Sequence, residues 1–239
     1  MSDPRIEVIE RRLEKVENII AVSSGKGGVG KSVVASTLSL ELSSRGYSVG
    51  LFDLDFTSPS THVILGIQDV FPDEEYGIIP PLVKGLRYMS IIFYALDRPA
   101  PLRGSEISDA IIEVLAITRW EELDYLIIDM PPGMGDATLD VIRLIPRIKF
   151  LMVSTPSKVA YETVRKQLTL LRGLDFPVIG VIENMVMHSL RLRSQVEEDG
   201  AEYLGSINYD PVLEEALGDI ERLKKTAMYA ELTKIVHHI

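Results

Sequence analysis

The segment SSGKGGVGKS, residues 23–32, limits the possible folds of this chain more than any other stretch. It fits the pattern G-x-x-x-x-G-K-[ST] and lies between an apolar run and a helical pattern, as a phosphate-binding loop requires. Glycines allow such a loop to curl with its backbone N–H groups facing inward, and the following helix adds its positive end. We therefore expect nucleotide binding by Gly25, Lys26, Gly27, Gly28, Val29, Gly30, Lys31 and Ser32.

Two side chains of this loop have specific expected roles. Lys31 is expected to place its charge against the β and γ phosphates, and Ser32 to offer its hydroxyl to Mg²⁺. The second lysine, Lys26, is not needed for holding phosphate from within, because Lys31 and the backbone already surround it. Its role must therefore lie elsewhere.

The composition is that of an acidic globular protein. With 239 residues, 46% of them hydrophobic, the chain is expected to form one domain over 1–239. A net charge of −10 disfavours general binding to nucleic acid, and no apolar run approaches the roughly 18 residues of a membrane helix. We see no signal peptide and expect a cytoplasmic protein. The absence of cysteine excludes thiolate ligands for zinc or an iron–sulfur cluster.

Short β-rich runs alternate with helical patterns, and several runs are continuously apolar, as strands buried on both faces are. The runs span 18–23, 47–53, 86–93, 124–129, 149–154, 177–182 and 203–207. The helical patterns span 32–44, 105–118, 137–145 and 161–174, with a lead-in helix within 1–18, an excursion loop at 68–85 and a helical C-terminal segment at 211–239. This alternation predicts an α/β fold with a mostly parallel sheet of about seven strands and helices on both faces.

Carboxylates follow two of the predicted strands, at the sheet edge where ligands bind. Asp53 and Asp55 lie where the second run ends, and alternation would point both to the same side. Asp129 ends the apolar run LIID, the pattern of a Walker B strand, so we expect it to hold water ligands of the magnesium. An Asx turn that leads into a helix is the alternative for Asp53 and Asp55.

Two further segments are expected near the nucleotide. Pro131, Pro132 and Gly133 cannot continue a strand, so they would turn the chain past the γ phosphate, where Gly133 could offer its N–H. Asn184 follows the sixth run, and the donor and acceptor of its amide could match an adenine edge. A turn-forming asparagine is the alternative there.

The segment KGGVGKS resembles the deviant Walker A loop of the ParA/MinD superfamily of P-loop NTPases, whose first lysine reaches the partner's nucleotide across a dimer interface. The resemblance implies a homodimer that encloses two ATP molecules, with Lys26, Lys31 and Asp55 as catalytic residues. It implies that Asp55 orients the attacking water, that Asp53 bonds to water around Mg²⁺, and that residues 131–133 are a second switch. A solvated loop lysine is the alternative for Lys26.

Five ordered motifs narrow the resemblance to the Mrp/ApbC branch, whose members are implicated in iron–sulfur cluster carriage. They are SSGKGGVGKS, DLDFTSPSTHVILGI, LIIDMPPGMGD, the STP at 154–156, and VIGVIENM. The branch's C-x-x-C after E-N-M is missing here, and His188 alone cannot replace it; its W-R-G-P is reduced to L-R-G-S at 102–105. The resemblance therefore implies the nucleotide machinery of that branch without a Cys-ligated cluster.

The resulting expectation is a slow, Mg²⁺-dependent, dimeric ATPase that acts on an unidentified protein client. The first alternative is a MinD-like spatial regulator that touches a membrane through an amphipathic C-terminal helix carrying Lys224, Lys225 and Leu232. A C-terminal helix that covers the core explains the same pattern, so neither membrane nor nucleic-acid partners are expected. The net charge disfavours a DNA-partitioning ATPase, and the lack of cysteine argues against a reductase like the nitrogenase iron protein.

Overall fold

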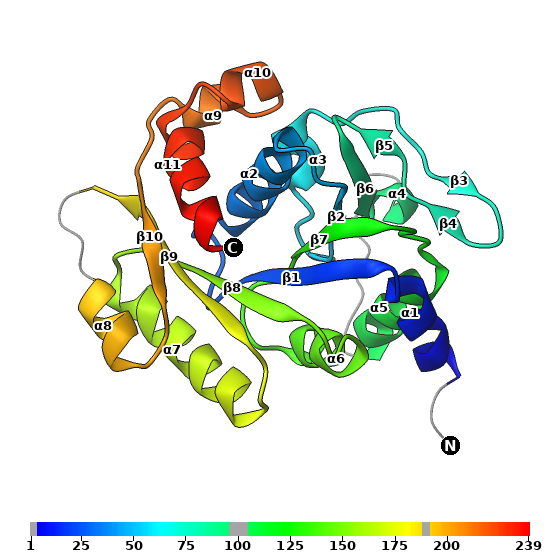
Figure 1. The fold of residues 1–239 in the computed structure, drawn as a ribbon, viewed down its shortest axis with the longest axis horizontal. Coiled ribbons are helices and arrows are strands. Elements are labelled where there is room, and N and C mark those ends of the chain that lie inside the picture. Colours follow the sequence, from blue (N-terminus) through cyan, green and yellow to red (C-terminus); the bar gives the residue numbers. More distant parts are fainter. Residues whose placement is uncertain (1–3, 96–104, 188–191) are drawn as a thin grey trace.

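A computed structural model of the chain describes residues 4–95, 105–187 and 192–239. Within them, eight strands form one sheet in the order β10-β9-β8-β1-β7-β2-β6-β5 (Figure 1). The strands are β1 (Val16–Ser24), β2 (Val49–Asp53), β5 (Leu82–Val83), β6 (Leu86–Ser90), β7 (Leu123–Asp129), β8 (Lys149–Ser154), β9 (Val178–Val186) and β10 (Tyr203–Asn208). Neighbouring strands are parallel except β5, which pairs antiparallel with β6 at the edge. The predicted, mostly parallel α/β sheet is confirmed.

Helices cover both faces of this sheet (Figure 1). One face carries α2 (Lys31–Ser44), α3 (Thr61–Leu65), α10 (Ile220–Leu223) and α11 (Ala227–Ile235), with α9 (Leu213–Ala216) nearby. The other carries α1 (Arg5–Leu13), α5 (Ser105–Ile117), α6 (Asp136–Leu144), α7 (Lys158–Gly173) and α8 (Arg193–Glu198). The short helix α4 (Ile92–Ala95) follows β6, and η1 (Val236–His238) follows α11.

The central strand β1 shows why its sequence is apolar without alternation. Ile19 and Ala21 belong to the core on one face, whereas Ile20 and Val22 belong to the core on the other. Successive side chains of a strand point to opposite faces, so a strand covered on both sides must be apolar at every position. The strand is therefore packed on both faces just before the glycine-rich loop begins.

Both ends of the chain differ from expectation. The lead-in helix, expected within 1–18, ends at Leu13, and Val16 begins β1 and pairs with Leu123. At Val16 the strand is favoured over a longer helix because strand pairing buries this side chain completely. The C-terminal segment is not one helix: Gly218, with φ of 85°, follows α9, and the Thr226 side chain caps α11. None of the helices in the described part of the chain is long and apolar enough to cross a bilayer.

The excursion at 68–85 also has more regular structure than expected. It contains a two-stranded antiparallel ribbon of β3 (Asp73–Glu74) and β4 (Ile78–Ile79), followed by the edge strand β5. The strand pairs are only two residues long, which is too short for period-two alternation to be visible in the sequence.

The packing of α11 on the sheet yields a stability prediction. Leu232 of α11 is fully buried in the core that also contains side chains of α2. Leu232→Ala should therefore lower the free energy of unfolding by about 2–5 kcal/mol. The matched control is Leu170→Ala on α7, because Leu170 is 38% exposed. It should lower the free energy of unfolding by less than about 1 kcal/mol. Urea unfolding measures both, and equal losses would show that α11 does not pack as described.

Candidate nucleotide site

The glycine-rich loop joins β1 to α2 at the carboxyl edge of the sheet. Gly30 precedes α2 with a left-handed φ of 82°, and a Cβ there would collide with the Asn184 side chain. A Cβ at Gly25 would collide with Thr163 of α7, whereas Gly27 has no neighbour within 4 Å. The loop therefore needs glycine at Gly25 and Gly30 because two other elements, α7 and β9, press against it.

A cavity of about 510 Å³ opens beside this loop. It is bounded by the loop, by the segment after β2 and by the segment after β7, which supply Lys26, Lys31, Ser32, Asp55, Thr57 and Pro132. Parallel strands gather the segments that follow them at one edge, which explains why motifs distant in sequence meet here. The volume is within the range of small-molecule sites.

Lys31, which lines the cavity, forms a buried ion pair with Asp129. The Lys31 Nζ lies 2.5 Å from Asp129 Oδ1, and the side chains are 7% and 0% exposed. Burial raises the pKa of the Asp129 carboxyl above its usual range, and the charge of Lys31 opposes this shift. The second oxygen, Oδ2, is buried and has no hydrogen-bond partner among the described residues. The Lys31 ammonium also donates to the Ser32 hydroxyl at 3.2 Å. An unpartnered carboxylate oxygen and a hydroxyl near the same lysine fit the donor set of Mg²⁺ and its water ligands.

Asp53 has the arrangement of the helix-capping alternative. Its Oδ1 accepts a hydrogen bond from the Asp55 N–H at 3.1 Å. Its Oδ2 accepts bonds from the Ser60 and Thr61 N–H groups and from the Thr61 hydroxyl at 2.7 Å. Both oxygens are thus engaged at the start of α3, and the expected role of Asp53 beside Mg²⁺ stays a prediction.

Asp55 differs from Asp53 because it lines the cavity. Its Oδ1 accepts hydrogen bonds from the Thr57 N–H, from the Thr57 hydroxyl at 2.6 Å and from the Ser58 N–H. These bonds fix the orientation of the carboxylate, whose Oδ2 accepts no hydrogen bond from the residues that the structure describes. This arrangement could orient a water molecule, so the sequence-based role of Asp55 remains compatible with its position.

The segment after β7 contacts the loop through its backbone. The Gly133 N–H donates to the Ser24 carbonyl at 2.8 Å, not into the cavity, so its predicted phosphate contact would require this bond to open. Pro132 lines the cavity, and Pro131 is half-buried.

The Gln167 amide of α7 also donates to the Ser24 carbonyl, at 3.3 Å. Sequence reasoning missed Gln167, although a polar residue within an apolar helical stripe is a usable signal.

Asn184 and Lys26 have opposite surroundings. Asn184, only 5% exposed, donates from Nδ2 to the Val29 carbonyl at 2.8 Å and thereby braces the loop. Its predicted contact with a nucleotide base remains a prediction. Lys26 is exposed, and no ion pair joins its ammonium group to another residue that the structure describes.

Two places where the sequence departs from the motifs of the Mrp/ApbC branch, 102–104 and His188, lie outside the described residues.

Family membership follows from comparison with known proteins. The family described as ParA, NUBPL iron-transfer P-loop NTPase matches residues 15–239. This chain belongs to that family. The predicted resemblance to the ParA/MinD superfamily of P-loop NTPases is thus confirmed, and the match begins just before β1.

Relatives place the chain more closely within this family. An iron–sulfur cluster carrier protein of Rickettsia felis is 41% identical over 174 residues, which cover 72% of this chain and 55% of the relative. One from Saccharolobus solfataricus is 35% identical over 226 residues, 87% of this chain and 76% of the relative. The chain therefore spans little more than half of the Rickettsia protein.

Solved structures support the fold. A nucleotide-binding protein of Archaeoglobus fulgidus, solved in complex with ADP, matches with a TM-score of 0.76 and 32% identity over 92% of this chain and 93% of that one. The cell division ATPase MinD of Pyrococcus furiosus matches with a TM-score of 0.70 at 19% identity over 93% and 98%. At that identity the second match supports the fold alone.

The close approach of α7 to the loop yields a second stability prediction. Gly25→Ala should lower the free energy of unfolding by about 1–3 kcal/mol, because the new methyl group must displace Thr163. Gly27→Ala, two positions along the same loop, meets no neighbour and should change it by no more than about 1 kcal/mol. Chemical denaturation of both variants measures the difference, and equal stabilities would contradict the described packing.

Proposed function

We propose that this chain binds ATP with Mg²⁺ and hydrolyses it slowly, and that two copies close around the nucleotides as a switch for an iron–sulfur client. The observation that carries the proposal is the buried Lys31–Asp129 pair, whose lysine lines a cavity bounded by a glycine-rich loop. A buried ion pair loses much of its attraction to desolvation, so it is weak evidence for stability and better evidence for a working site.

The described residues can perform the steps that phosphoryl transfer needs. The loop backbone and Lys31 would hold the β and γ phosphates, with the Ser32 hydroxyl and the waters of Asp129 as ligands of the metal. Bound Mg²⁺ would neutralise charge on the phosphate oxygens. Asp55, fixed by Thr57, would orient a water molecule in line with the γ phosphorus. The water oxygen would bond to phosphorus as the bond from phosphorus to the ADP oxygen breaks, and the proton of the water would pass to an oxygen of the released phosphate.

Lys26 supports the dimeric part of the proposal. It lines the cavity, is exposed, and has no ion-pair partner among the residues that the structure describes. Its charge is therefore available to a triphosphate held by a second copy, where it would stabilise negative charge in the transition state. Assembly of the dimer and hydrolysis would then depend on each other.

The client is inferred from the relatives. Several are named iron–sulfur cluster carrier proteins, which favours a role in handling such clusters. This chain contains no cysteine, and the described residues contain no group of three or more His, Asp or Glu placed to hold a metal. We therefore infer that its contribution is a nucleotide-dependent change of conformation that a client protein recognises.

The MinD-like membrane alternative is not favoured. It depended on the apolar residues of the C-terminal segment being available to lipid. Met228, Leu232 and Ile235 are instead buried against α2 and β10, as a core-covering helix requires. The MinD structures match at identities that support only the fold.

Lys31 and Asp55 should separate binding from hydrolysis. Lys31→Ala should weaken ATP binding at least about tenfold, because it removes the buried charge that faces the phosphates. Asp55→Asn keeps an oxygen acceptor for Thr57 and should leave ATP binding intact while lowering turnover by about 10² or more. Binding of a fluorescent ATP analogue and release of phosphate measure the two effects. Wild-type turnover by Asp55→Asn would reject its assigned role.

Lys26 should contribute to dimerisation and hydrolysis but not to the binding of ATP by a single chain. Lys26→Ala is expected to bind ATP normally as a single chain, yet to lose both hydrolysis and the increase in mass that a non-hydrolysable ATP analogue causes relative to ADP. Light scattering after size-exclusion chromatography measures that mass. Lys225→Ala, another exposed lysine, is the matched control and should behave as wild type. A Lys26→Ala protein that dimerises and turns over normally would refute the contact across the interface.

A further inference from the structure

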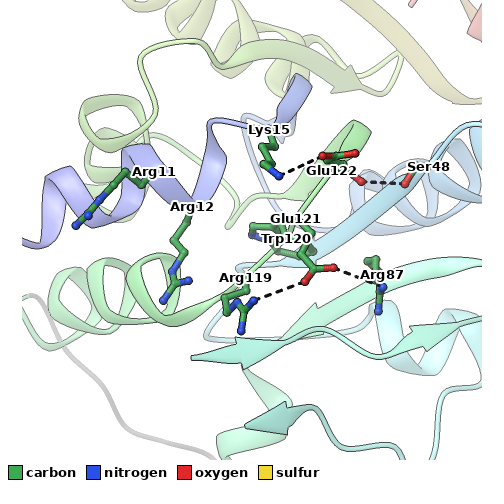
Figure 2. A pocket seen from close by; sticks show the side chains of 9 residues that line it. All are labelled: Arg11, Arg12, Lys15, Ser48, Arg87, Arg119, Trp120, Glu121 and Glu122. Atoms are coloured by element: carbon green, nitrogen blue, oxygen red, sulfur yellow. Dashed lines mark hydrogen bonds and ion pairs between the residues drawn. The ribbon is translucent and has the colours of Figure 1, made fainter. Parts of the chain in front are cut away.

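Positive charge gathers at the opposite edge of the sheet from the nucleotide site. Five cationic side chains and two carboxylates line a cavity of about 510 Å³ at the amino ends of β2, β6 and β7 (Figure 2). The cations are Arg11, Arg12, Lys15, Arg87 and Arg119. In a chain whose net charge is −10, this local excess is not a consequence of overall composition. We call this cavity the basic pocket.

Three of the four arginines of the basic pocket are held in place by backbone carbonyls of other segments. Arg12 donates to the Ala116 and Tyr76 carbonyls at 3.1 and 3.0 Å. Arg119 donates to the Glu75 carbonyl at 2.7 Å, and Arg87 to the Pro80 carbonyl at 3.2 Å. Each guanidinium has five N–H donors, so these bonds fix its position and leave other donors available. This ordering distinguishes the basic pocket from a surface of solvated, mobile charges.

The positive charges are only partly neutralised: Lys15 pairs closely with Glu122, at 3.1 Å, whereas the arginines lack a close carboxylate among the described residues. Figure 2 shows Glu121 between Arg119 and Arg87, at 3.7 and 3.9 Å from their nitrogens. Hydrogen-bonded ion pairs are closer, about 2.7–2.9 Å, so Glu121 marks a place for negative charge without saturating it. Burial and the charges of Arg119 and Arg11 lower the pKa of Arg12, as expected for cations that lack a strong counter-ion.

We propose that the basic pocket is a second ligand site that binds a small polyanion carrying phosphate or carboxylate groups. Guanidinium forks match both groups, and cations contributed by three separate segments favour a ligand with more than one of them. The cavity has the volume of a small-molecule site, whereas nucleic acid would require an extended basic stripe. Glu121 competes with the ligand for Arg87 and Arg119.

The site is separate from the nucleotide cavity. Strand β7 runs from Leu123, which follows Glu122 of the basic pocket, to Asp129, whose ion-pair partner Lys31 lines the nucleotide cavity; this is a distance of roughly 20 Å at the usual rise per residue. Trp120, which is 1% exposed, lines the basic pocket and is the only tryptophan in the chain. Its fluorescence therefore reports on this end of the molecule.

The test is a titration of Trp120 emission with sodium pyrophosphate and, separately, with sodium citrate, in magnesium-free buffer at constant ionic strength. A saturable change with either anion supports the site, and the anion that gives it identifies the preferred group. Lys31→Ala should retain the response even though it is expected to lose ATP binding, which separates this site from the proposed function. No saturable change with either anion would overturn the proposal.

Two variants should shift the half-saturating concentration in opposite directions. Arg119→Gln should raise it about tenfold, since it removes a tethered guanidinium. Glu121→Gln should lower it about threefold, since it removes the competing carboxylate, and a misfolded protein could not produce such a gain.

Matched controls remove the same charges elsewhere. Glu197 pairs with Arg193 at 3.7 Å on α8, and Arg222 is exposed on α10, so Glu197→Gln and Arg222→Gln should leave the titration unchanged. A response shared equally by Glu121→Gln and Glu197→Gln would mean that only net charge matters and would refute the site.

Discussion

The parallel pairing of β1 with β7 is the constraint on which the rest of the site depends. Its register sets Val22 beside Asp129, two residues before β1 ends and the glycine-rich loop begins. The loop then returns to the sheet at Lys31, whose ammonium group meets that carboxylate. A shift of one residue would turn Asp129 to the other face, so the apolar residues that fix the register also position the charges.

One backbone carbonyl connects the loop to two other elements. Ser24 ends β1, and its carbonyl accepts the Gly133 N–H from the segment after β7 and the Gln167 amide from α7. Gly25, the next residue, is pressed against Thr163 of the same helix. Any movement of Gly133 toward the cavity must break its bond to Ser24, and Gln167 would then be the remaining donor. The segment after β7 and the loop are therefore mechanically coupled.

Much of this architecture could be predicted because its signals are local. The bounds of β8 follow from one apolar run, and the loop was located by its glycines and lysine. The capping role of Asp53 was visible only as an alternative, since the same spacing suits a ligand of metal-bound water and a helix cap. The division of the C-terminal segment also had local signals, Gly218 after α9 and the Thr226 cap of α11, but the helical pattern of the segment concealed them. Nothing in sequence brings Arg12, Arg87 and Arg119 together, because they meet only through the fold.

The two charged edges follow from one topological fact. In a parallel sheet, segments that precede strands collect at one edge and segments that follow them at the other, so this fold separates Arg119 before β7 from Asp129 at its end. Exposed charges are screened over about 8 Å at physiological ionic strength, well short of the length of the strand. A ligand in the basic pocket could therefore influence the nucleotide cavity only through β7 and its neighbours. Because both faces of these strands are packed, such an influence would have to move whole elements and not single side chains.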